Sequence, residues 1–303
     1  MKPCLSHSFL PSRNHLSLII YSADLTRFTG IPRLDYAVAA AETYGLRLVL
    51  VLNNNYDDLG GINTYTNAFG GTHNSWFSDA RSQAAYQAWI KFVIRRYKSS
   101  CAIFSYELMN EPRCSGCGTS DVIYNWAKTT SEYVKSLDAK HMVTLGDEGW
   151  LAPTDQLVPG NDGSYAYSGY EGVDFTRNLA IPTLDYGTFH IYPTQWGYDE
   201  NWPNTWIKQH NAIGKAAGKP VVLEEYGLPT PPDQRLPFVR QWQQTVLRDT
   251  SLAYDSFWQY GEVFPSGDRP LDDYAVYHGT DEYAILADQH AVDMAAKPGR
   301  ATV

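Results

Sequence analysis

The sequence predicts an α/β fold, a (β/α)8 or TIM barrel in which parallel strands alternate with helices. Short apolar runs rich in Val, Ile and Leu alternate with longer stretches of helical period, the pattern of repeated βα units around a buried parallel sheet. The chain has 303 residues, and one such barrel needs roughly 250. No low-complexity tract, linker or short repeat interrupts the sequence, so we expect a single main domain.

Strands and helices can be placed along the chain from these patterns. Strands are expected at residues 46–53, 102–110, 141–147, 185–192, 220–226 and 256–260. Helices are expected at residues 32–44, 80–98, 121–137, 203–217, 234–248 and 282–295. A further strand at residues 16–21 has a weaker pattern, so the barrel is expected to be incomplete at its N-terminal end.

Polar side chains with chemical capacity follow several of the predicted strands. Because parallel strands in such a barrel carry function at their carboxyl ends, we expect these side chains to form the site. They are Asn53-Asn54-Asn55, Asn110-Glu111, Asp147-Glu148, His190 with Tyr192, and Glu225.

The composition is that of an ordinary globular protein that does not bind polyanions. Hydrophobic residues make up 44% and charged residues 19% of the chain, no apolar run approaches the roughly 20 residues of a membrane helix, and the net charge is -9. Nucleic acid and membrane are therefore unexpected partners. The 22 Tyr and 9 Trp suit a surface that stacks on sugars, although aromatic packing in the core is the more common reason for such a composition.

The four cysteines include one CxxC pair, Cys114 and Cys117, besides Cys4 and Cys101. Such a pair is compatible with a redox site, half a zinc site or a disulfide in a small loop. We favour the disulfide because no second CxxC or histidine pair at zinc spacing accompanies it. A disulfide would indicate secretion, although the first 23 residues make a poor signal peptide.

Glu111 and Glu225 are the strand-end carboxylates that point to a reaction. Glu111 precedes Pro112, which ends the strand's hydrogen-bonding ladder, and Glu225 ends another apolar strand. A single strand-end glutamate is more often a cap or an ion-pair partner. Hydrolysis of a glycosidic bond, however, needs two carboxyl groups, one to protonate the leaving oxygen and one to meet the developing oxocarbenium carbon. The pair therefore predicts a glycoside hydrolase.

The motifs around these residues resemble glycoside hydrolase family 5. They are Asn110-Glu111-Pro112, Phe189-His190-Ile191-Tyr192-Pro193, Leu223-Glu224-Glu225-Tyr226-Gly227 and Phe257-Trp258-Gln259-Tyr260. Within that family, the segments at residues 54–63, 67–71, 113–117 and 145–149 resemble the fungal endo-β-1,4-mannanases. The resemblance covers residues 32–291.

The resemblance implies retaining endo-hydrolysis of β-1,4-mannosidic bonds without cofactor or metal. Glu111 takes the acid/base position and Glu225 the nucleophile position. Asn110, His190, Tyr192 and Trp258 match substrate-binding or positioning residues, and Trp76, Asp147 and Glu148 match positions near the cleft. A retaining mechanism predicts that the two catalytic carboxyls lie about 5–5.5 Å apart.

Residues 1–30 depart from the family and form a divergent segment before the barrel domain at residues 31–303. The family's first two strands and the arginine that supports its nucleophile are not recognisable, and neither Arg13 nor Arg27 has the right context. We therefore expect this chain to fold poorly and to be at least about 100-fold less active than a version with a family-like N-terminus.

Two rival interpretations remain. The chain could be another β-1,4-glycanase such as a cellulase, because the catalytic pair is common to both, or a catalytically impaired glycan-binding remnant. The mannanase-like loops favour the mannanase over the other β-1,4-glycanases, and we expect a secreted, monomeric enzyme acting on β-mannan polysaccharide.

Overall fold

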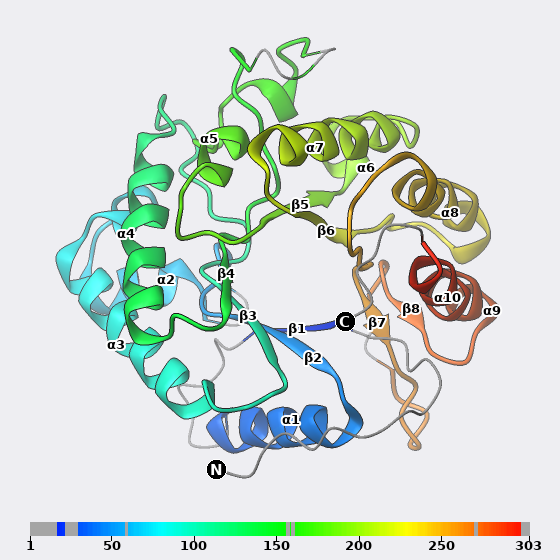
Figure 1. Cartoon of the computed structure of the whole chain (residues 1–303), viewed down its shortest axis with the longest axis horizontal. Coiled ribbons are helices and arrows are strands. Elements are labelled where there is room, and N and C mark those ends of the chain that lie inside the picture. Colours follow the sequence, from blue (N-terminus) through cyan, green and yellow to red (C-terminus); the bar gives the residue numbers. More distant parts are fainter. Residues whose placement is uncertain are drawn as a thin grey trace. The chain divides into compact units, whose positions relative to one another are not determined.

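The computed structural model describes residues 17–21, 30–57, 60–155, 158, 161–269 and 272–297. The chain divides into two compact units: Met1–Cys114 with Asp121–Gly146, and Ser115–Ser120 with Asp147–Val303. Both are built from parallel strands and helices (Figure 1). The α/β class is therefore confirmed.

The first unit is a four-stranded parallel sheet with strand order β1-β2-β3-β4. Its elements are β1 Ser17–Tyr21, α1 Gly30–Tyr44, β2 Arg47–Val51, α2 Ile62–Phe69, the 3-10 helix η2 Asn74–Phe77, α3 Ala80–Tyr97, β3 Ile103–Glu107, α4 Asp121–Leu137 and β4 Met142–Thr144. The middle of β2 is buried from Leu48 to Val51, as expected for a parallel strand covered on both faces. Helix α3 begins at a cap, where the Asp79 carboxylate accepts the Ser82 N–H at 2.9 Å, and it packs against α4.

The N-terminal segment supplies a strand to this sheet. Residues Ser17 to Tyr21 pair in parallel with Arg47 to Val51 along their whole length, which confirms the weaker strand predicted at residues 16–21. Arg13 and Arg27 lie outside the described residues.

The second unit contains two parallel strand pairs, β5-β6 and β7-β8. Its elements are the 3-10 helix η3 Tyr165–Tyr167, α5 Phe175–Leu179, β5 Gly187–Ile191, α6 Pro193–Trp196, α7 Pro203–Ala217, β6 Val221–Tyr226, α8 Pro232–Asp249, β7 Tyr260–Gly261, β8 Val276–Tyr277, α9 Asp281–Tyr283, the π-helix η4 Ala284–Gln289 and α10 His290–Ala295. Every residue of β5 and β6 is buried. Helices α7 and α8 pack against each other and both begin with proline in the first turn, where its missing N–H costs nothing.

The strand predicted at residues 256–260 was wrong for most of its length. This segment is extended and follows β6, since Ser256 N–H donates to Leu223 O and Trp258 N–H donates to Tyr226 O. It forms only an isolated bridge, between Leu223 and Asp255, and the regular strand β7 begins at Tyr260. Strand β8 was missed because two residues are too few for a periodic pattern. None of the helices in the described ranges is both long and apolar enough to cross a membrane.

Candidate active site

In the first unit, Glu111 is fixed through its backbone just beyond the end of β3. Its N–H donates to Gly146 O at 2.8 Å, and the preceding Asn110 donates to Asn53 O at 3.0 Å. Glu111 has a positive φ of 50°, a conformation that costs a non-glycine residue on the order of 1 kcal/mol. The neighbouring backbone thus imposes this conformation and determines where the side chain can lie.

Close approach of two chain segments explains the glycine at position 146. Gly146 has a φ of 89°, and a Cβ there would lie 2.2 Å from Met109 O and 2.3 Å from Glu107 Oε1. No side chain fits at that distance. The Leu-Gly-Asp-Glu-Gly sequence therefore lets the segment after β4 approach the strand exit that carries Glu111.

The Glu111 carboxylate is held by a phenol and a guanidinium. The Tyr56 hydroxyl donates to Glu111 Oε2 at 2.7 Å, and Arg113 Nη2 lies 3.8 Å from the same oxygen. The guanidinium also sits over the Tyr56 ring, 5.7 Å from its centroid. Glu111 is buried, but Tyr56 is 40% exposed, so this hydrogen-bond donor lies at the surface of the unit.

Asparagines complete the surroundings of Glu111. The Asn110 amide donates to Asn54 Oδ1 at 3.2 Å, and Asn54 and Asn110 form a parallel bridge beyond the ends of β2 and β3. Asn55 Oδ1 accepts the backbone N–H of Arg113 at 3.2 Å and lies 2.8 Å from His73 Nε2. The strand-end residues predicted from sequence in this unit are therefore brought together.

In the second unit, Glu225 lies at the end of β6 beside residues of β5. A register shift between Phe189 and His190 pairs His190 with Glu225. The Tyr192 hydroxyl donates to Glu225 Oε2 at 2.6 Å, and His190 Nδ1 lies 3.6 Å from that oxygen. Tyr192 is only 8% exposed, so this carboxylate is held from within the fold.

A cluster of buried acids surrounds His190. Its Nε2 lies 3.7 Å from Glu224 Oε2, an oxygen that has no hydrogen-bond partner among the described residues. Asp147, which is also buried, accepts the Gly149 N–H at 3.1 Å and the Asn178 amide at 3.3 Å. Burial raises the pKa of Asp147 to about 7, with nearby Glu224 adding to the effect. Asp147 therefore holds a proton under mildly acidic conditions.

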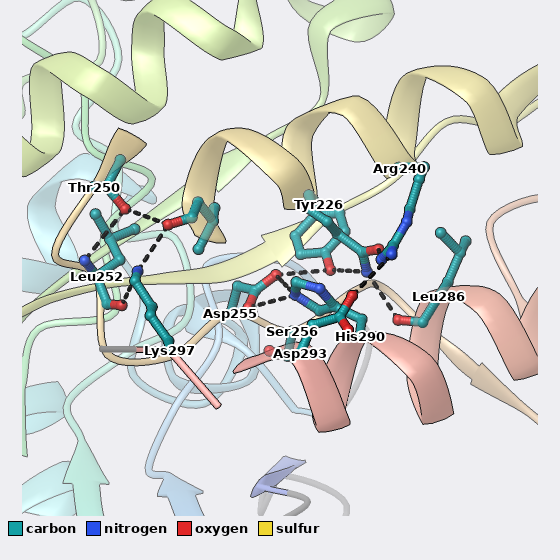
Figure 2. A network of polar contacts seen from close by, with 12 residues as sticks. Tyr226, Arg240, Thr250, Leu252, Asp255, Ser256, Leu286, His290, Asp293 and Lys297 are labelled. Atoms are coloured by element: carbon teal, nitrogen blue, oxygen red, sulfur yellow. Dashed lines mark hydrogen bonds and ion pairs between the residues drawn. The ribbon is translucent and has the colours of Figure 1, made fainter. Parts of the chain in front are cut away.

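Tyr226, directly after Glu225, belongs to a buried polar network (Figure 2). Its hydroxyl donates to Asp255 Oδ2 at 3.1 Å and accepts from Gln243 at 2.9 Å. His290 Nε2 lies 2.8 and 2.9 Å from the two oxygens of Asp255. Residues of α8, α10 and the segment before β7 thus fix the end of β6. Nothing in the sequence pattern singled out this network.

Three residues that were predicted near the cleft are buried. Trp76 is 0% exposed and packs in an aromatic cluster with Tyr65, Phe77, Tyr86 and Trp126, so the structure places it in the core and gives it no surface for a substrate contact. Asp147 and Glu148 are also buried; Glu148 accepts the Trp150 indole N–H at 3.0 Å. Trp258 is half-buried, and its backbone N–H donates to Tyr226 O at 2.9 Å.

Cys114 and Cys117 are both disulfide-bonded, whereas Cys101 takes no part in a disulfide. Cys4 lies outside the described residues. Of the alternatives for the CxxC pair, the disulfide is therefore the one observed.

Comparison with known proteins finds a matching family and similar relatives. The profile described as GH family 5 beta-mannosidase-like matches residues 79–284. A probable mannan endo-1,4-beta-mannosidase A of Aspergillus clavatus is 46% identical over 90% of this chain and 74% of its own length. The corresponding Aspergillus oryzae protein is 48% identical, with 86% of this chain and 65% of the relative covered. This chain thus spans roughly two thirds to three quarters of these two relatives.

Two solved structures with similar folds are mannanases. The endo-beta-1,4-mannanase from Thermotoga petrophila superposes with a TM-score of 0.81 at 34% identity, over 90% of this chain and 63% of that one. The endo-1,4-beta-mannanase from Rhizomucor miehei superposes with a TM-score of 0.79 at 34% identity, over 89% of this chain and 77% of that one.

Proposed function

Because the chain belongs to the family 5 β-mannosidase-like glycoside hydrolases, we propose that it cleaves β-1,4-mannosidic bonds within mannan, glucomannan or galactomannan. The observation that carries this proposal is the pair of buried glutamates, each just at or beyond a parallel strand end and each accepting a hydrogen bond from a tyrosine. The fold that goes with the proposal is the complete (β/α)8 barrel.

The proposed reaction is a double displacement. The Glu225 carboxylate attacks the anomeric carbon while the Glu111 carboxyl group donates its proton to the departing glycosidic oxygen, which leaves as the new chain end. Glu111, now ionised, then takes a proton from water, the resulting hydroxide adds to the anomeric carbon and Glu225 departs. Two inversions give net retention. Proton and nucleophile both come from side chains, so the reaction needs no cofactor.

The residues beside each glutamate have roles that fit their contacts. Tyr192 donates to Glu225 Oε2, which orients one oxygen and leaves the other for attack. His190 separates Glu225 from Glu224, so we assign it to positioning, and Glu224 is a neighbour, not the nucleophile. Asn110, with its amide oriented by Asn54, binds the sugar hydroxyl next to the reacting carbon.

Further substrate contacts are proposed away from the reacting bond. Trp258 is half-buried in the extended segment that pairs with the end of β6. An indole there can stack on the apolar face of a sugar. Asp147 and Glu148 are buried near His190, where Glu148 O accepts the His190 N–H at 3.2 Å, and we assign them to supporting the surroundings of Glu225. For Trp76, packing in the core accounts for the residue.

Mannan is favoured over other β-1,4-glycans because the named relatives are mannan endo-1,4-beta-mannosidases. Secretion is proposed because the two disulfide-bonded cysteines need an oxidising compartment. The proposed partner is the β-mannan polymer alone, bound by a monomer.

The test is hydrolysis of mannan, glucomannan and carboxymethyl cellulose by the purified chain, with Glu225→Gln as the matched control. Cleavage of both mannans with slower or no release from the cellulose derivative supports the proposal. Faster release from the cellulose derivative would make the chain another β-1,4-glycanase. Binding to mannan without any release of sugar would make it a glycan-binding remnant.

A further inference from the structure

Tyr274, two residues before β8, contacts the tyrosine that holds the proposed nucleophile. The rings of Tyr274 and Tyr192 meet edge to face, with centroids 5.5 Å apart and planes at 88°, a geometry that favours aromatic pairs. The Gln195 amide donates to the Tyr274 hydroxyl at 2.6 Å. Because Gln195 lies on α6, which starts directly after Tyr192, Tyr274 contacts this short segment twice.

The contact continues to the carboxylate. The Tyr192 hydroxyl donates to Glu225 Oε2 at 2.6 Å, so one ring separates Tyr274 from the oxygen that receives the hydrogen bond. Rotation of a tyrosine side chain about its Cα–Cβ bond carries the hydroxyl away from such an acceptor. A ring edge packed against Tyr192 restricts that rotation.

Tyr274 itself is held by a buried arginine. Arg235 on α8 donates to Asp273 O at 2.6 Å and to Ala275 O at 2.7 Å, the carbonyls on either side of Tyr274. The same guanidinium forms a bidentate ion pair with Glu282 at 2.6 and 2.8 Å. Both charged side chains are buried, and breaking such a pair leaves an uncompensated charge in the interior. The backbone around Tyr274 is therefore firmly anchored.

A second anchor joins Tyr274 to the segment that carries Trp258. Asp272 accepts the Tyr274 N–H at 2.7 Å and the Gln259 amide at 2.8 Å. Gly227 has a matching restriction, because a Cβ there would lie 2.7 Å from Tyr274 Cδ1. The end of β6 thus has a glycine where the Tyr274 ring must lie close.

We propose that Tyr274 is a positioning residue: it holds the Tyr192 hydroxyl against Glu225, and Arg235 holds Tyr274 in place. This inference rests on the proposed function, since the geometry matters only if Glu225 is the nucleophile. Loss of the ring lets Tyr192 turn, and a catalytic group misplaced by about 1 Å can lose on the order of 100-fold in rate.

The test compares Tyr274→Ala, Tyr274→Phe, Tyr192→Phe and the double variant Tyr192→Phe/Tyr274→Ala on mannooligosaccharides. We expect Tyr274→Ala to lower kcat about 10-fold with little change in KM. The acidic limb of its kcat/KM profile should move to higher pH, because a carboxylate that loses a donor is harder to ionise. Tyr274→Phe keeps the ring edge and should recover most of the activity. The double variant should be no slower than Tyr192→Phe alone.

Tyr277→Ala serves as the matched control, because Tyr277 lies on β8 and packs near Gly261 and Arg269. It should lower Tm without moving the acidic limb. Inactive wild-type protein would contradict the proposed function itself. Active wild type with additive losses in the double variant, or Tyr274→Ala that lowers Tm alone with an unchanged pH profile, would overturn the positioning role.

Discussion

The surroundings of Glu111 and Glu225 differ in how deeply their supports are buried. Glu111 is held by Tyr56 and Arg113, and Tyr56 is 40% exposed. Glu225 is held by Tyr192 and His190, both buried, with further buried groups behind them. Each glutamate thus has a phenol donor, but only the Glu225 donor is shielded from water.

This difference fits the two proposed roles. A nucleophile has to remain ionised and point at one carbon atom, so a rigid, dry donor serves it. An acid/base residue changes its protonation state twice in each cycle, and supports that water can reach tolerate that change. We therefore expect substitutions around Glu225 to have larger effects than equivalent ones around Glu111.

The largest effect is expected from the glutamates themselves. Glu225→Gln should lose on the order of 10⁴-fold or more in kcat on every substrate, since no group replaces the nucleophile. Glu111→Gln should lose a similar factor on mannan, but much less in the first step on an aryl β-mannobioside whose leaving group needs no proton. Pre-steady-state kinetics on both substrates would measure the difference.

Added azide separates the two roles further. Azide attacks without a general base, so it should restore turnover of the aryl substrate in Glu111→Gln and give a β-configured glycosyl azide. The opposite assignment would follow if Glu111→Gln were inactive on the aryl substrate and Glu225→Gln retained activity.

A smaller effect is expected from the two phenols. Tyr192→Phe removes a buried, charge-assisted hydrogen bond and should lower kcat/KM by about 10- to 100-fold. Tyr56→Phe should lower it by about 3- to 10-fold, because water can replace an exposed donor. The pH profiles should also differ: the acidic limb moves to higher pH in Tyr192→Phe, and the basic limb does so in Tyr56→Phe. Equal losses, or shifts in the same limb, would show that burial does not distinguish the two hydrogen-bond donors.

The smallest effect on activity, but a clear one on stability, is expected from Asp147→Asn. Burial raises the pKa of Asp147 to about 7 in the folded chain from an ordinary value of 3.8. The folded state therefore binds more protons than the unfolded state between these values, and wild-type stability falls as the pH rises through that range. An asparagine has no charge to bury, and it can hydrogen-bond with Asn178 if the Asn178 amide turns over, since Asn178 Oδ1 has no partner in the described structure.

We therefore expect the difference in Tm between Asp147→Asn and wild type to shift in favour of the variant by several degrees from pH 4 to pH 8. Each kcal/mol of stability corresponds to about 2–4 °C. Calorimetry at a series of pH values would measure it, with Asp162→Asn as an exposed control. A difference in Tm that stays constant with pH would show that Asp147 is already ionised at acidic pH.

The sequence predicted those parts of the molecule that depend on periodicity and strand ends. The helices at Asp121–Leu137 and Pro203–Ala217 and the buried strands β2, β3, β5 and β6 follow from their apolar patterns. The motifs at strand ends singled out the candidate site residues Asn110, Glu111, His190, Tyr192 and Glu225. The disulfide was favoured because no second CxxC or histidine pair at zinc spacing accompanied Cys114 and Cys117.

The parts that could not be predicted depend on tertiary contacts between distant residues. Tyr56 was not predicted as a site residue, yet it donates to Glu111. The Asp255–His290 contact joins positions 35 residues apart, and Arg235 and Glu282 are 47 apart. Neither pair has a local signal. Trp76 matched a cleft position, but packing with neighbouring rings removed it from the surface.

The central claim, that Glu225 forms a covalent intermediate, can be tested most directly by trapping. In a 2-deoxy-2-fluoro-β-mannobiosyl fluoride, the fluorine at C2 slows both chemical steps, whereas the fluoride at C1 departs readily. The glycosyl-enzyme should therefore accumulate. Peptide mass spectrometry of the digested protein should find one added fluoromannobiosyl group, with fragmentation placing it on Glu225 and Glu111→Gln giving the same labelled peptide. A label on Glu224, or an unlabelled protein that releases the α-anomer from mannooligosaccharides, would contradict the account.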